Sequence, residues 1–76
     1  MSNLPHITGP ELIRALQHLG FHVIRRKGSH SFLRHTEDPT RVAIVATHKG
    51  ETIPPGNLTA ILRTAKITVE ELRKYI

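Results

Sequence analysis

The residues best suited to chemistry lie in the segment RRKGSHSFLRH, which spans positions 25–35. His30 follows Gly28 and Ser29 directly, and arginine and lysine residues stand on both sides of this step. Glycine can adopt positive φ and lets a ligand approach closely, and N–H groups exposed at such a turn can hold a phosphate oxygen. A neutral imidazole titrates near neutral pH and can take a proton from a ribose 2′-hydroxyl group. Two interpretations follow, a catalytic histidine acting on RNA or an exposed hairpin histidine among solvated cations.

Cations of this segment would bind phosphate groups and stabilise the charge that develops on them during cleavage. They are Arg25, Arg26, Lys27 and Arg34. A second histidine, His48, stands beside Lys49 in the segment THKG, where the third expected strand runs into a loop. If the ends of neighbouring strands converge there, His48 becomes a second catalytic or RNA-contacting group, with Lys49 supporting RNA binding. As an isolated loop histidine, it is simply exposed to solvent.

Other kinds of catalytic site find little support in the sequence. Four residues separate His30 from His35, so on a strand the two rings point to opposite faces, and no acidic residue completes a metal-ligand set. We therefore expect no metal ion and no other cofactor. Ser29 has no evident buried acid to orient the adjacent histidine, which argues against a serine nucleophile. The aromatic side chains are Phe21, Phe32 and Tyr75. We expect two of them in the core, so base stacking is not the expected main mode of recognition.

Chain length, cysteine content and net charge restrict the class of protein. With 76 residues, the chain is expected to form one domain over positions 1–76. It has no cysteine, no apolar run long enough to cross a membrane and no signal-peptide pattern, which favours a reducing cytoplasm. Eleven Lys and Arg residues against six Asp and Glu residues give a formal charge of +5. This positive charge favours a polyanion as partner, and nucleic acid is the first candidate. The alternatives are a basic surface that serves only solubility and a surface that binds an acidic protein.

Capping and turn signals indicate the elements that position these side chains. The segments expected to form helices are 7–20, 57–66 and 67–76, and those expected to form strands are 21–27, 30–35 and 41–47. Thr8 with Glu11, and Thr68 with Glu71, have the capping-box spacing that begins a helix. A Gly-Ser pair joins the first two strands, which predicts an antiparallel hairpin. The unbroken apolar run of the third strand predicts burial on both faces or a central place in the sheet.

These motifs together resemble the HicA toxin family, also called YcfA-like, of bacterial toxin–antitoxin pairs. The resemblance covers nearly the whole chain, in TGPELIRALQHLGFHVIRRKGSHSFLRH and again in THKGETIPPGNLTAILRTAKITVEEL. Its strongest element is Gly-Ser-His after a basic strand, and its second is a His-x-Gly loop followed by a Gly-x-Leu-x-x-Ile-Leu helix. Their order and spacing in so short a chain are specific. Many relatives have histidine where this chain has Ser31, and Ala-Gly where it has Ala65-Lys66.

The resemblance implies a double-stranded-RNA-binding-domain-like α+β fold, with helices on one face of a three-stranded antiparallel sheet. It also implies a metal-independent endoribonuclease, an mRNA interferase, that acts on messenger RNA in the bacterial cytoplasm. The family's catalytic histidine falls on His30, its neighbours on Gly28 and Ser29, and its loop histidine on His48. The implied partner is a HicB antitoxin that covers the active site in a toxin–antitoxin hetero-oligomer. A non-catalytic RNA-binding module of the same fold is the alternative, and a domain that binds only an acidic antitoxin is a third.

Overall fold

Local sequence signals place the helices and strands close to the expected segments. The computed structural model describes residues 4–76. The elements are α1 (Gly9–His18), β1 (Phe21–Lys27), β2 (His30–His35), β3 (Val42–Ala46), α2 (Pro55–Ala65) and α3 (Val69–Arg73). This order confirms the predicted α-β-β-β-α-α arrangement. α2 begins two residues before the expected segment, at a proline, which the first helical position tolerates because its missing N–H would have no partner there.

Side-chain capping explains why α1 and α3 begin where they do. In α1, the Thr8 hydroxyl accepts a hydrogen bond from the Glu11 backbone N–H at 3.3 Å, and the Glu11 carboxylate accepts one from the Thr8 N–H at 2.8 Å. Thr68 and Glu71 repeat this pair at the start of α3, at 3.1 and 2.9 Å. Each pair satisfies N–H groups that lack a partner within the helix. α2 ends at Lys66 in the left-handed conformation, with φ of 59°.

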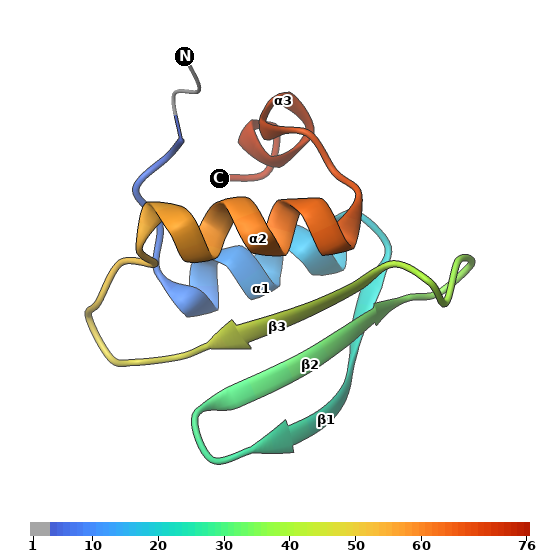
Figure 1. Ribbon diagram of the computed structural model, residues 1–76, viewed down its shortest axis with the longest axis horizontal. Helices are drawn as coiled ribbons and strands as arrows, with labels where there is room; N and C mark the ends of the chain where they lie inside the picture. Colours follow the sequence, from blue (N-terminus) through green and yellow to red (C-terminus); the bar gives the residue numbers. More distant parts are fainter. Residues whose placement is uncertain (1–3) are drawn as a thin grey trace.

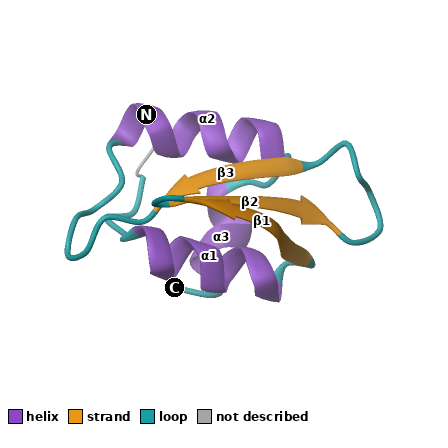
Figure 2. Ribbon diagram, turned by 90° about the horizontal axis from the view of Figure 1, so that it is seen from below, coloured by secondary structure: helices purple, strands orange, loops and turns teal. Residues whose placement is uncertain are grey.

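The sheet has a helix-covered face and an open face (Figure 1). Its strand order is β1-β2-β3, all antiparallel, so β2 is central. Figure 2 shows α1 lying toward β1 and α2 running along β3. The core fills the space between the helices and the covered face, which confirms the double-stranded-RNA-binding-domain-like arrangement. Its largest fully buried side chains are Leu12, Leu16, Leu33, Leu58, Leu72 and Val45.

The third strand corrects one expectation from the sequence. Its apolar run predicted burial on both faces or a central place, but β3 is an edge strand whose side chains alternate between buried and exposed. Ala43 and Val45 are buried against the helices, whereas Ile44 is 52% exposed on the open face. The prediction was wrong because an apolar run does not reveal whether a second layer covers the strand. The outer side chain of Ile44 forms part of a cavity wall instead.

A β-bulge in β1 turns the second half of that strand over. Val23 pairs with the buried Leu33, but the next pair along the ladder joins Arg25 to Phe32. Residues directly opposite each other in an antiparallel ladder lie on the same face, so Val23 faces the helices and Arg25 faces the open side. Without the extra residue, strict alternation would direct Arg25 toward the core together with Val23. The extra residue is Ile24, which is 43% exposed.

Candidate functional site

The open face of the sheet brings His30 together with cations of the neighbouring strand. His30 begins β2 and pairs with Lys27 of β1 and with Ala46 of β3. Two positions along β2, Phe32 lies on the same face and pairs with Arg25, whose guanidinium carbon is 5.7 Å from the Phe32 ring centroid. This distance is typical of a cation–π contact, which holds the Arg25 charge over the sheet. The ladder therefore places His30, Arg25 and Lys27 on one surface.

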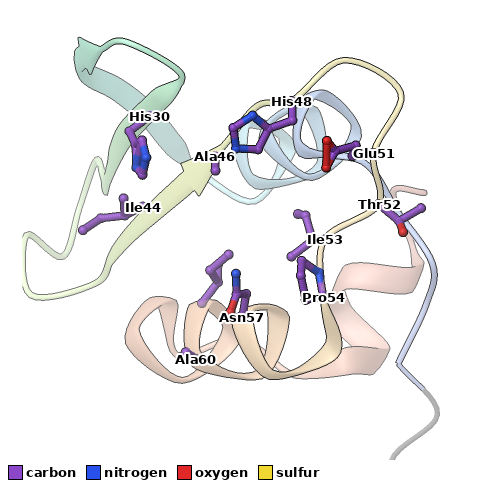
Figure 3. A pocket seen from close by; sticks show the side chains of 11 residues that line it. His30, Ile44, Ala46, His48, Glu51, Thr52, Ile53, Pro54, Asn57 and Ala60 are labelled. Carbon is purple, nitrogen blue, oxygen red and sulfur yellow. The ribbon is translucent and has the colours of Figure 1, made fainter.

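His30 also lines a cavity of about 480 Å³ between the sheet and α2 (Figure 3). The walls from the sheet and from α2 consist of His30, Ile44, Ala46, Asn57, Ala60 and Ile61. The loop between β3 and α2 adds His48 and Glu51 at one end of the cavity. Figure 3 shows His30 on the sheet side of this space and Asn57 on the helix side. The cavity therefore lies between an imidazole and a carboxamide that are distant in sequence.

Gly28 and Ser29 position His30 through the backbone. Gly28 has φ of 58°, a left-handed conformation that glycine adopts readily, and a Cβ added there would meet nothing within 4 Å. The conformation, and not crowding, therefore favours glycine at this turn. The Ser29 carbonyl oxygen accepts hydrogen bonds from the Thr47 backbone N–H at 2.7 Å and from the Thr47 hydroxyl at 3.0 Å. These bonds tie the hairpin to the end of β3 and keep His30 beside the loop that begins there.

The loop that carries His48 is anchored at both ends. Its start is tied to the hairpin by the bonds just described, and at its end the Ile53 N–H donates to the Ile7 carbonyl oxygen at 2.8 Å. Within the loop, the Glu51 N–H donates to the His48 carbonyl oxygen at 3.1 Å and closes a turn. The strand ends thus converge, which is the condition for His48 to act as a second catalytic or RNA-contacting group, and His30 and His48 line the same cavity.

Other predicted RNA-binding residues lie away from the cavity. Arg26 pairs with the buried Ser31, so it faces the helix side of the sheet, although its side chain is exposed. Arg34 shares the open face with His30 but lies four residues further along β2, a distance of about 13 Å. Lys49 is exposed in the loop and does not line the cavity. The part that these residues play in RNA binding stays a prediction.

Asn57 and Glu51 are polar residues of the cavity lining that could not be singled out from the sequence. An acidic residue in a polar loop and an asparagine near a helix start are common features of surfaces, so neither residue stood out. A weak signal existed for Asn57, which directly precedes Leu58, the first buried residue of α2. A polar side chain adjacent to the buried face of a helix emerges at the edge of the core, where cavities form.

A comparison with protein families decides the class of this protein. A family model described as HicA toxin of bacterial toxin–antitoxin matches residues 9–67, which is more than half of the chain. The chain belongs to the HicA toxin family. The matched region begins with α1 and contains the whole sheet, α2, His30 and His48. This protein is therefore the toxin of a toxin–antitoxin pair and has an antitoxin as partner. A comparison with curated proteins found no match.

This HicA toxin departs from many relatives at positions that leave the His30 surface unchanged. Ser31 is only 2% exposed and faces the helices, whereas His30 faces the open side, because successive residues of a strand alternate. At the second departure, Lys66 accepts the left-handed conformation that glycine would adopt at lower cost. Arg41 supports this helix end, since its Nε donates to the Ala65 carbonyl oxygen at 2.8 Å.

The described histidines of this HicA toxin do not gather into a metal site. Within residues 4–76, no group of three or more His, Cys, Asp and Glu side chains is arranged to hold a metal ion. The His35 Nδ1 accepts hydrogen bonds from the Glu37 and Asp38 backbone N–H groups at 3.1 and 3.2 Å, which occupies the lone pair that a metal would need. Over the same residues, no helix combines the length and the apolar character needed to span a bilayer.

The aromatic residues of this HicA toxin correct another expectation. Two of the three aromatic side chains were expected in the core, but only Phe21 is there, at 3% exposure. Phe32 lies on the open face beneath Arg25. Tyr75 is 43% exposed and stacks on His18, with ring centroids 5.2 Å apart. Small domains can leave an aromatic ring exposed when a stacking partner covers one of its faces.

Proposed function

We propose that this HicA toxin is a metal-independent endoribonuclease that cuts messenger RNA, with His30 as its catalytic residue. The observation that carries the proposal is the β1 bulge, because it puts Arg25 and Lys27 on the same face of the sheet as His30, with Lys27 directly opposite His30 in the ladder. A phosphodiester group bound by these cations would lie against the imidazole, and such positioning accounts for a large part of catalysis. The formal charge of +5 supports an anionic substrate.

The proposed reaction is an intramolecular transesterification of the RNA backbone. The ribose 2′-oxygen attacks the adjacent phosphorus atom, the bond from phosphorus to the 5′-oxygen breaks, and a 2′,3′-cyclic phosphate and a 5′-hydroxyl group form. One proton must leave the 2′-oxygen and one must reach the 5′-oxygen, so the atoms balance without a redox partner. In this proposal His30 exchanges one of these protons and His48, which lines the same cavity, exchanges the other.

Charge stabilisation is the second part of the proposed mechanism. Negative charge builds up on the phosphate oxygens in the transition state, and positive groups aimed at that position lower the barrier. Arg25 and Lys27 supply such charges from β1, and the backbone N–H groups of the Gly28-Ser29 turn add dipoles that favour an anion. The cations would therefore serve both in RNA binding and in the cleavage step.

We further propose that the antitoxin partner is of the HicB type and that it blocks RNA cleavage by covering the His30 surface. The cavity and the cationic surface adjoin each other, so a protein that covers one also covers the other. Acidic side chains of the antitoxin would complement Arg25 and Lys27 at this surface. An antitoxin that covers this surface can inhibit the toxin without changing the toxin's conformation.

The test compares wild type with His30→Ala and with His6→Ala, which removes another exposed histidine. Loss of a general acid or base lowers a rate by about a hundred- to ten-thousand-fold, so His30→Ala should cut RNA slower by this factor. RNA affinity and melting temperature should stay near wild type, because His30 is exposed and the phosphate contacts come from Arg and Lys. His6→Ala should cut at the wild-type rate, and excess EDTA should leave all rates unchanged.

Several outcomes would contradict the proposal. Cleavage by His30→Ala near the wild-type rate would remove the catalytic role and make His48 the next candidate. Activity lost in EDTA and restored by zinc or magnesium would contradict the metal-independent mechanism. Wild-type protein that binds RNA but never cuts it would support the alternative, a non-catalytic RNA-binding module of the same fold.

A further inference from the structure

We infer that the cavity between β3 and α2 holds one unpaired nucleobase of the RNA, and that Asn57 determines which base is accepted. This inference rests on the proposed function and adds the substrate class to it. His30 lines the cavity from the sheet and Asn57 lines it from α2 (Figure 3). A base in this space would therefore belong to a nucleotide adjoining the phosphate that His30 acts on.

The distribution of charge on the toxin indicates which surface binds the RNA backbone and which binds a base. Arg25 and Lys27 lie on the open face of the sheet, where they attract the anionic backbone. Neither of these cations lines the cavity, and the carboxylate of Glu51 at its loop end repels a phosphate group. A nucleic acid bound to both surfaces consequently keeps its phosphates on the hairpin and sends an uncharged group into the cavity. In RNA, that uncharged group is a base.

The size and the walls of the cavity suit a flat ring. Its volume of about 480 Å³ lies within the range of about 300–1,000 Å³ that small-molecule sites occupy. Ile44 and Ala46 form an apolar wall on the sheet side, and Ala60 and Ile61 form the other on α2. A base between these walls makes dispersion contacts on both faces without needing an aromatic partner. Burial of the base removes its apolar faces from water and stabilises the complex.

Asn57 supplies the polar group that such a cavity needs for selectivity. Its side chain points into the cavity from the first turn of α2 (Figure 3). Within residues 4–76 the Asn57 carboxamide makes no hydrogen bond to the protein, so its donor and its acceptor are both free for a ligand. An asparagine carboxamide matches adenine best, since it accepts from N6 and donates to N7 at once. We therefore assign adenine as the preferred base.

The same geometry excludes base-paired RNA from cleavage. A base can enter the space between the sheet and α2 only after it has left its own helix, and unpairing is easiest in single strands, loops and bulges. This HicA toxin thus combines a fold that resembles double-stranded-RNA-binding domains with a site for single-stranded RNA.

The experiment maps cleavage sites of wild type, Asn57→Ala and Asn57→Asp on a pool of single-stranded RNA and on the same sequences as duplexes. Wild type should cut single strands next to adenine and leave duplexes intact. One bidentate pair gives about 5- to 150-fold discrimination between bases, so Asn57→Ala should reduce the adenine preference by this factor. Asn57→Asp keeps only acceptors and should shift the preference toward cytosine, whose N4 group is a donor. Gln17→Ala, which removes an exposed carboxamide from α1, should keep the wild-type preference.

A second variant fills the cavity instead of changing its polar group. Ala60→Leu adds an isopropyl group at an exposed position on the cavity wall, so it should lower kcat/KM for RNA while the melting temperature stays the same. Wild-type cleavage without base preference, or an unchanged preference in Asn57→Ala, would overturn the inference and leave the proposed function standing. Ala60→Leu that still cleaves RNA but no longer binds antitoxin would assign the cavity to the protein partner. Wild type that cuts no RNA would remove both proposals together.

Discussion

Ile24 has more influence on the surface of this toxin than its aliphatic side chain suggests. As the extra residue of the bulge, it places Arg25 and Lys27 on the open face, where Arg25 packs over Phe32. Arg26 follows the same ladder but faces the helix side. Neighbouring cations with the same formal charge therefore have different access to a substrate on the open face.

This difference between neighbours predicts how RNA affinity responds to salt. Each phosphate contact with a single strand adds about 0.7 to the slope of log affinity against log salt concentration, because a bound counterion is released. Arg25→Ala and Lys27→Ala should each flatten the slope by about 0.7, whereas Arg26→Ala should leave it near wild type. Binding isotherms at several salt concentrations measure the slope. Arg26→Ala with the largest effect of the three would contradict the placement of the RNA on the open face.

At the scale of elements, the helix ends were the easiest parts to predict. Thr8 with Glu11, and Thr68 with Glu71, form both reciprocal hydrogen bonds of the box that their spacing predicted. These signals are local, since each depends on residues only three positions apart. Local chemistry of this kind is present in the sequence itself, so the starts of α1 and α3 could be derived before any tertiary contact was known.

The sheet shows where prediction from sequence stops. The hairpin at Gly28 was predictable from its turn residues, but nothing in FHVIRRK marks Ile24 as a bulge. A strictly alternating strand would have sent Arg25 toward the core, so the cationic face depends on pairing with β2. The cavity was beyond prediction for a similar reason, because its walls come from positions as far apart as His30 and Ile61 and meet only in the folded chain.

The capping boxes also predict a dependence of stability on pH. Hydrogen bonds from the Thr8 backbone N–H, and then from its hydroxyl, hold the pKa of Glu11 below its ordinary value of 4.5. The Thr68 backbone N–H lowers the pKa of Glu71 in the same way. A carboxylate whose pKa is lower in the folded state stabilises the fold above its unfolded-state pKa, and this stability is lost as pH falls through the folded-state pKa.

Thermal melting between about pH 6 and pH 3 should reveal this loss. Glutamine also serves in a capping box but does not titrate, so Glu11→Gln combined with Glu71→Gln should flatten the fall in melting temperature with acid. Glu70→Gln removes one carboxylate outside either box and should keep the acid sensitivity of wild type. An equal fall in melting temperature for the double variant and wild type would show that the boxes contribute nothing to the pH dependence.

At the scale of the whole molecule, the architecture is asymmetric. The chain extends over 29 × 25 × 19 Å, with its helices on one side and the open face of the sheet on the other (Figure 1). The covered face contributes the core, and the open face contributes charge and the His30 side of the cavity. A domain of this size buries only about 60% of its unfolded surface. An antitoxin bound to the open face would therefore stabilise the toxin as well as block it.

This asymmetry predicts which lysines the antitoxin protects. Lys27 lies on the open face beside His30, whereas Lys74 follows α3 at the opposite end of the molecule (Figure 1). Acetylation of exposed amines, followed by mass spectrometry, should show strong protection of Lys27 and little protection of Lys74 in the complex. The melting temperature of the toxin should rise with antitoxin concentration. Protection confined to Lys74, with His30 still open to solvent, would show that neutralisation does not work by occlusion.

The wide sequence separation of the cavity walls has a consequence during synthesis of the chain. Ile61 leaves the ribosome's catalytic centre 31 residues after His30. At about 5–20 residues per second, this delay lasts about 2–6 s. During that interval the residues of the hairpin, with its cations and its histidine, have already been added to the chain, but the α2 wall has not. A chain that stops short of α2 therefore carries the cations and His30 but lacks the helix side of the cavity in which an RNA base would be held.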